Sequence, residues 1–241
     1  MLFRSVFCFG SPGETEHTIQ ESIDLLMQLQ PLAVVFYMLV TFPGTRLYEQ
    51  AKKTGRVTDE IWHQKIEDLP WFEVDEDLDF DQVQQFGNAL RKAFYDHLPQ
   101  FAENVRLSDD PSLSSFHADF LSRLGMTFSH GDYSTDDRIT DPDGTAKVLF
   151  ERALTCHPNL RAFLGLGMLF LKHRHLDTAI QILDQGLNHF PGSKDLGLCK
   201  GICLMNQHRF AEARAWLSPF KHHADVGHYL AVCQQHLETH P

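Results

Sequence analysis

The stretch from Gly10 to Glu14 reads Gly-Ser-Pro-Gly-Glu and has the residue types of a ligand-binding loop. Glycine lets a backbone approach a ligand closely, and N–H groups at a helix start bind anions. A phosphate-binding Walker loop needs G-x-x-x-x-G-K-[ST], however, and this loop lacks both the spacing and the lysine. Glu14 itself stands where an anion would bind. The residues argue against phosphate and leave two interpretations, a plain turn or a loop that contacts another ligand.

The cysteines form no complete metal or disulfide motif. Cys199 and Cys203 give C-x3-C, but Asn206 stands where the third cysteine of an iron–sulfur motif would be. The odd, scattered set is typical of reduced thiols: Cys8, Cys156, Cys199, Cys203 and Cys233. We expect the pair at 199 and 203 to be buried in a helix, and Cys8 to lie in the core within a strand.

Other ionisable residues give no enzyme motif. The sequence has no H-E-x-x-H and no G-x-S-x-G, and the Asp141–Gly144 stretch lacks the ligand spacing of a calcium loop. Several histidines fall at predicted turns or helix ends, where we expect them to be solvated: His173, His175, His208, His222 and His223. A metal-dependent or hydrolytic enzyme is therefore unsupported.

The elements that position the first loop read as a βαβ unit. Leu2–Phe9 and Ala33–Val40 are continuous apolar runs, which predict parallel strands covered on both faces. Between them, Thr15–Leu29 has apolar residues at helical spacing, with acidic residues in its first turn. Gly10–Glu14 would then follow the carboxyl end of the first strand.

A second loop repeats this plan after the second strand. Pro43 and Gly44 form the turn, and a short helix is expected around Leu47–Lys53, with Gly55 as its stop. The acidic run Glu73–Asp81 indicates a solvated connection. Asp79 or Asp81 would cap a further helix running through Val83, Phe86, Leu90 and Phe94.

From about Phe116 the pattern becomes purely helical and repeats. The positions that carry the period are Ala146, Phe150, Ala153 and Pro158, then, 33 residues later, Ala179, Leu183, Gly186 and Pro191. This is the second-helix half of a tetratricopeptide repeat. The first-helix half falls at Phe163, Leu166, Gly167 and Phe170, and Leu121, Leu124, Gly125 and Phe128 fit the same first-helix pattern. A weaker copy of the repeat has Gly201, Leu204, Phe210, Ala213 and Leu217.

The spacing within each pair fixes the register of the helices. Gly167 to Ala179 and Gly201 to Ala213 are both 12 residues, whereas Gly125 to Ala146 is 21, so the first pair should hold nine extra residues in its turn. We expect these small residues to allow close helix packing. A final helix from about Asp225 to Leu237 would cover the end of the stack.

The first hundred residues resemble a known enzyme family. "FGSPGETEHTIQESIDL", then "VFYMLVTFPGTRLYEQAKKTG", then "ALRKAFYDH" are similar to the last third of the radical S-adenosylmethionine domain, in the group that often carries a cobalamin-binding domain. The resemblance covers about Leu2 to Phe101 and implies part of a (β/α)6 barrel. It places Gly10, Pro12, Gly13 and Glu14 near S-adenosylmethionine, and Pro43, Gly44 and Thr45 on the substrate side.

The chain departs from that family in its cysteines. The family binds a [4Fe-4S] cluster through C-x3-C-x2-C after the first barrel strand, and this motif is missing here. The resemblance therefore implies the C-terminal part of such an enzyme, with no catalytic residue, cluster or metal held by this chain alone. Its remaining activity would be binding a protein or peptide through the repeats, besides the missing barrel half. The alternative is a free-standing adaptor with a structural remnant of the barrel.

The composition of the chain limits the classes of partner and the location that can be expected. The chain has 241 residues and a net charge of −11, which disfavours nucleic acid and anionic lipid as partners. No apolar run reaches the length of a membrane span and no signal sequence is evident, so a cytoplasmic protein is expected. The predicted fold is α/β plus all-α, with a partial barrel at residues 1–100, a linker at 101–115 and helical repeats at 116–241.

Overall fold

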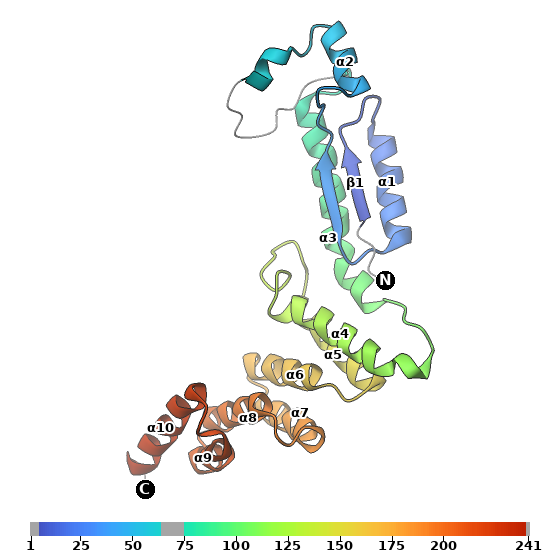
Figure 1. The fold of residues 1–241 in the computed structure, drawn as a ribbon. Coiled ribbons are helices and arrows are strands. Elements are labelled where there is room, and N and C mark those ends of the chain that lie inside the picture. Colours follow the sequence, from blue (N-terminus) through green and yellow to red (C-terminus); the bar gives the residue numbers. More distant parts are fainter. Residues whose placement is uncertain (1–4, 64–74, 240–241) are drawn as a thin grey trace. The chain divides into compact units, whose positions relative to one another are not determined.

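A computed structural model describes residues 5–63 and 75–239 of the chain, which forms two compact units divided between Phe101 and Ala102. Figure 1 labels β1 and the α-helices of both units. In chain order the elements are β1 (Ser5–Phe9), α1 (Glu16–Leu29), β2 (Val34–Met38), α2 (Arg46–Lys53), the 3-10 helix η1 (Asp59–His63), α3 (Phe80–Glu103), η2 (Pro111–Leu113), α4 (Ser114–Ser129), α5 (Pro142–Cys156), α6 (Leu160–Lys172), α7 (Leu176–His189), α8 (Lys194–Asn206), α9 (Phe210–Leu217), η3 (Ser218–Phe220) and α10 (Ala224–Thr239).

The first unit contains the predicted βαβ arrangement. β1 and β2 are parallel neighbours, with Ser5 opposite Val34 and Phe9 opposite Met38, and α1 connects them (Figure 1). β2 is shorter than the apolar run Ala33–Val40 that predicted it. The first residues of the Leu2–Phe9 prediction, and Glu73 at the start of the acidic run, lie outside the described residues.

Among the described residues, helices cover only one face of this small sheet, which corrects the expectation that both faces would be covered. Phe7 and Phe9 point into a core formed with Ile19 of α1 and Leu90 of α3. The alternate side chains are open: Val6 is 58% exposed, Tyr37 is 59% exposed, and Cys8 is exposed rather than in the core. A strand sends successive side chains to opposite faces, so Cys8 lies with Val6 opposite Phe9.

Local capping explains where the helices of this unit begin. The hydroxyl oxygen of Thr15 accepts the N–H of Thr18, and the hydroxyl oxygen of Thr18 accepts the N–H of Thr15. These two bonds form a reciprocal cap at the start of α1. Asp79, rather than Asp81, accepts the N–H of Gln82 at 2.8 Å beside the start of α3. The predicted helix α2 begins at Arg46 and is followed by Gly55 at φ +72°.

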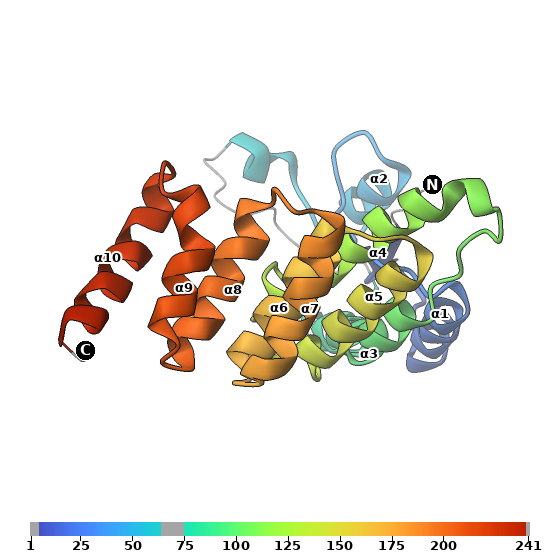
Figure 2. The ribbon, with the colours of Figure 1, turned by 90° about the horizontal axis from the view of Figure 1, so that it is seen from below.

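The second unit consists of helices packed against their neighbours in the chain. α4 packs on α5, α6 on α7, and α8 on α9, and α10 packs against α9 at the end of the chain. Figure 2 shows α8, α9 and α10 following one another beside the overlapping α6 and α7. The nine extra residues of the first pair lie in the 130–141 connection between α4 and α5. The predicted final helix is α10.

Each helix pair has a close contact between a glycine and a large buried side chain. A Cβ on Gly125 would lie 2.7 Å from the Phe150 ring, and one on Gly167 would lie 2.6 Å from Leu183. The third pair repeats the contact, because a Cβ on Gly201 would lie 2.7 Å from Leu217. The prediction that these glycines serve helix packing is therefore confirmed.

The segment before the repeats is shorter than the predicted 101–115 linker. α3 continues to Glu103, and η2 begins at Pro111. Within the second unit, Arg152 of α5 donates to the carbonyl oxygens of Glu103 and Val105, and Thr145 donates to the Glu103 carboxylate at 3.0 Å. These bonds fix residues 103–105 against α5. None of the helices in the described part of the chain is long and apolar enough to cross a membrane.

Candidate functional site

The first candidate site is the loop rim at the carboxyl ends of β1 and β2. Gly10 follows β1 at φ +85°, Gly13 follows at φ +79°, and Gly44 follows β2 at φ +85°. Such values are costly for residues with a Cβ, so glycine permits these turns. Because parallel strands end at the same edge of a sheet, both loops lie at one edge, where α/β proteins commonly bind ligands.

Two carboxylates of the chain occupy the backbone donors of this rim. The N–H of Gly10 donates to Glu14 Oε2 at 2.5 Å, and the N–H of Gly13 donates to Asp75 Oδ2 at 2.6 Å. The backbone N–H groups of Asp77 and Gly13 hold the pKa of Asp75 below its ordinary value. The rim is therefore acidic, and both donors are already satisfied within the chain.

A cleft of about 400 Å³ lies beside the rim. Its lining residues are Pro12, Leu47, Gln50, Ala51, Thr54, Arg56, Asp75, Glu76 and Asp77. On the second loop, Thr45 has a local role, because its hydroxyl accepts the N–H of Tyr48 and donates to the carbonyl of Phe42. Pro43 and Gly44 are exposed. Of the residues predicted from the resemblance, only Pro12 lines the cleft directly.

The rim fits one part of S-adenosylmethionine better than another. Glu14 and Asp75 could face its sulfonium and ammonium charges, whereas its carboxylate would meet the acidic cleft with both loop donors taken. A cluster held by three thiolates does not fit this unit alone, because Cys8 is the only cysteine in its sequence.

The second candidate site lies on the first helix of each pair. α4, α6 and α8 are neighbours, α4 with α6 and α6 with α8. Each carries a stripe at spacings of three, seven and ten residues, which lies along one side of a helix. The stripes are Asp119, Ser122, Met126 and Ser129 on α4; Arg161, Leu164, Met168 and Leu171 on α6; and Asp195, Leu198, Ile202 and Met205 on α8. We call these twelve residues the three-helix face.

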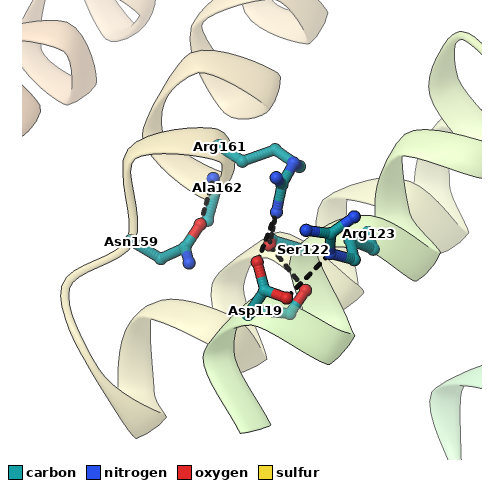
Figure 3. A network of polar contacts seen from close by, with 6 residues as sticks. All are labelled: Asp119, Ser122, Arg123, Asn159, Arg161 and Ala162. Carbon is teal, nitrogen blue, oxygen red and sulfur yellow. Dashed lines mark hydrogen bonds and ion pairs between the residues drawn. The ribbon is translucent and has the colours of Figure 1, made fainter. Parts of the chain in front are cut away.

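A polar network joins the first two stripes, and Figure 3 shows it from close by. Arg161 donates from Nη1 to Asp119 Oδ1 at 2.8 Å and to Ser122 Oγ at 3.1 Å. Arg123 donates to the other carboxylate oxygen of Asp119 at 2.7 Å. Asn159 caps α6 by accepting the N–H of Ala162, which fixes the start of the helix that carries Arg161. The network thus aligns α6 with α4.

The network also perturbs the acid at its centre. The Arg161 guanidinium, followed by that of Arg123, holds the pKa of Asp119 below its ordinary value of 3.8. Ser122 is fully buried, and its hydroxyl donates to the carbonyl oxygen of Asp119. Asp119 is therefore a carboxylate at neutral pH, and both of its oxygens are occupied by cations.

The middle of the three-helix face is apolar and half-buried. Its apolar side chains are Met126, Leu164, Met168, Leu171, Leu198, Ile202 and Met205. Leu164, Met168 and Leu171 rest on the core formed by Phe163, Leu183 and Leu196, among others. Methionine adapts its shape to irregular partners, and three of these seven residues are methionines. The face is therefore an apolar surface that rests on a packed core, and its methionine side chains can adjust to the shape of a partner.

Sequence reasoning identified the core positions of the repeat but missed the residues of this face. Asp119 and Arg161 were not among the predicted sites, although each stands six residues before the packing glycine of its helix, as Asp195 does before Gly201. That common offset is the signal that could have identified them. The contact between α4 and α6 cannot be derived from the offset alone.

Several other ionisable residues have partners within the chain. Asp143 of α5 pairs with Lys172 at 2.6 Å and with His173 at 2.8 Å, both on or after α6. The five histidines predicted to be solvated are exposed. Cys199 and Cys203 are buried, as expected. Among residues 5–63 and 75–239, no three His, Cys, Asp or Glu side chains are grouped as metal ligands would be.

Compared with known proteins, the sequence matches no protein-family model and no curated protein. The function of the chain is therefore inferred from the geometry of its own residues.

Proposed function

We propose that the second unit binds a protein segment across the three-helix face. The observation that carries this proposal is the side-by-side arrangement of α4, α6 and α8 with equivalent stripes, of which the middle is apolar and half-buried. Stacked helix pairs expose such a surface to partners, as tetratricopeptide repeats do. The 33-residue period and the three glycine contacts support a repeat of that kind.

The apolar side chains give the surface its binding energy. Burying apolar area stabilises a complex by about 25 cal/mol per Å², before the costs of association. Leu164 and Met168 are supported from below by the buried Phe163 and Leu183, so an approaching partner meets side chains already held in place. Preorganisation of this kind reduces the entropy lost on binding.

A substitution on the face tests this function. Met168→Glu places a charge in the apolar middle, and a peptide selected from a random library against the wild-type chain should lose at least tenfold in affinity, about 1.4 kcal/mol. Gln181→Glu adds the same charge on α7, away from the face, and should leave binding unchanged. Equal binding by all three chains would contradict the proposal.

For the first unit, we propose that it belongs to the barrel of a radical S-adenosylmethionine enzyme. The open sheet face favours this, because parallel strands are normally covered on both sides and Val6, Cys8 and Tyr37 are not. The remaining barrel strands would cover them and supply the cluster cysteines. Alone, the chain would then be inactive; formation of 5'-deoxyadenosine by the chain reconstituted with iron and sulfide would contradict this.

The alternative is a free-standing adaptor whose first unit is a structural remnant. An adaptor would be monomeric and would unfold cooperatively with its exposed strand face, whereas part of a barrel would be poorly soluble alone. Sedimentation and thermal unfolding of the purified chain distinguish the two. In both cases the second unit would bind its partner through the three-helix face.

A further inference from the structure

We infer that Asp75, Glu76 and Asp77 form a strap that closes one side of the cleft beside the loop rim and opens as a unit. These three residues, which we call the strap, are among the nine that line the cleft, and the others belong to the first loop and to residues 47–56. An opening strap would control access to the cleft, whichever function the first unit has.

Two carboxylates attach the strap to two different parts of the first unit. Asp75 Oδ2 accepts the N–H of Gly13, in the loop after β1, at 2.6 Å. Glu76 Oε1 lies 2.9 Å from Nη2 of Arg56, which follows α2. The N–H of Asp77 donates to Asp75 Oδ1 at 3.0 Å, a bond within the strap that keeps its shape. The strap therefore ties the first loop to the residues after α2.

Both attachments are exposed to water, so they break and re-form more easily than buried contacts do. The side chain of Glu76 is 87% exposed, and an ion pair of this kind contributes little stability because water and salt screen it. The bond from Gly13 to Asp75 is exposed as well. Segments held by exposed hydrogen bonds open locally while the rest of a protein stays folded.

The chain is fixed directly after the strap. Leu78 is 3% exposed and packs in the core with Val83 of α3. The N–H of Asp79 donates to Gln82 Oε1 at 3.0 Å, and the N–H of Gln82 donates to Asp79 Oδ1 at 2.8 Å. The strap can therefore leave the cleft by rotation of the backbone next to Leu78, while α3 stays in place.

Amide hydrogen exchange at Gly13, measured by NMR on the whole chain, tests the strap. Asp75→Ala removes the acceptor, so the Gly13 amide should exchange about fivefold faster or more. Glu76→Gln leaves the bond to Gly13 in place, yet it should speed this exchange about twofold, because losing one attachment raises the fraction of open strap. Asp77→Asn makes the same charge change as Glu76→Gln, keeps both attachments, and should leave the exchange rate at the wild-type value.

Salt gives a second reading of the same equilibrium. Raising the NaCl concentration from about 0.05 to about 0.5 M screens the pair of Glu76 with Arg56. Exchange at Gly13 should then become faster in the wild type and change less in Glu76→Gln. Wild-type exchange at Gly13 in Glu76→Gln would mean that the two attachments are independent contacts, and it would overturn the inference. Unchanged exchange in Asp75→Ala would also overturn it, because the strap would then not hold Gly13.

Discussion

A Cβ atom placed on Gly167 of α6 would lie 2.6 Å from Cδ2 of Leu183 on α7, closer than any ordinary contact. Leu183 is fully buried, so it has no room to move aside. The two helices therefore touch at a distance that only glycine allows. The same contact in the other two pairs fixes how each first helix sits, and with it the three-helix face.

The first prediction concerns this contact. Gly167→Leu should lower the free energy of unfolding by about 1–3 kcal/mol, since it overpacks a filled core. Gly227→Leu is a matched control in α10, where a Cβ would meet nothing within 4 Å and leucine favours helix over glycine. Chemical denaturation of both variants checks the difference. Equal stability of the two would count against the packing described for α6 and α7.

The second prediction concerns Gly10 in the loop rim. Gly10→Ala combines a positive φ with a Cβ 2.9 Å from Val83, a fully buried residue of α3. Gly13→Ala has a similar φ but meets nothing within 4 Å. We expect Gly13→Ala to lower the free energy of unfolding by about 1–2 kcal/mol, because alanine is strained at this positive φ. Gly10→Ala should lower it further, because its Cβ also meets Val83. A larger loss of stability for Gly13→Ala would show that the Val83 contact is wrong.

The third prediction concerns Lys200 of α8, which stands where α6 has Leu166. Its ammonium is buried, 2.6 Å from Asp184 Oδ1 and 3.4 Å from the centre of the Trp216 ring. Asp184→Ala leaves this charge without its anion and should cost about 1–3 kcal/mol. The separate variant Lys200→Met removes the buried charge itself, so it should change the free energy of unfolding by less than about 1 kcal/mol. Thermal unfolding should rank the variants in this order, and the reverse order would contradict the arrangement.

The fourth prediction is a pH dependence. The pKa of Asp119 is held below 3.8 in the folded chain by Arg161 and then Arg123. Because the folded pKa is the lower one, the stabilisation is present above about pH 4 and is lost as the pH falls through the folded value. The stability difference between wild type and Arg161→Gln should be constant from pH 5 to 7 and shrink below pH 4. NMR titration should also show a higher Asp119 pKa in Arg161→Gln.

The fifth prediction concerns the thiols. Cys8 is exposed, whereas Cys199, Cys203 and Cys233 are buried. Mild alkylation of the native chain should therefore modify Cys8, whereas the three buried thiols should react only after the chain is unfolded. Peptide mass analysis can show which cysteines are modified. Protection of Cys8 in the isolated chain would mean that the open sheet face is covered.

Local patterns predicted most of the secondary structure because local physics determines it. The glycine stop at Gly55 and a cap at Asp79 or Asp81 were predicted from residue types, and the structure has the cap at Asp79. The register of the helix pairs followed from the spacing of small and large residues. These features depend on neighbours a few residues apart, or on a period that the sequence repeats.

The features that were predicted wrongly or missed depend on contacts between residues that are far apart in the sequence. A continuous apolar strand such as β1 indicates a sheet that is covered on both faces. Whether each face is buried depends, however, on which other elements pack against it, and here Cys8 and Tyr37 are exposed. Likewise, the bond from Gly13 to Asp75 joins residues 62 positions apart, and that from Arg161 to Asp119 joins residues 42 apart. Helical periodicity gives the side of each helix but not its partner.

The central claim is that a partner binds across α4, α6 and α8. Methionine methyl NMR tests it most directly, because Met126, Met168 and Met205 lie on this face, one on each helix, whereas Met27 and Met38 lie in the first unit. On adding a peptide selected by the chain, the signals of Met126, Met168 and Met205 should shift and those of Met27 and Met38 should stay. Shifts confined to Met27 and Met38, with the other three unchanged, would contradict the claim.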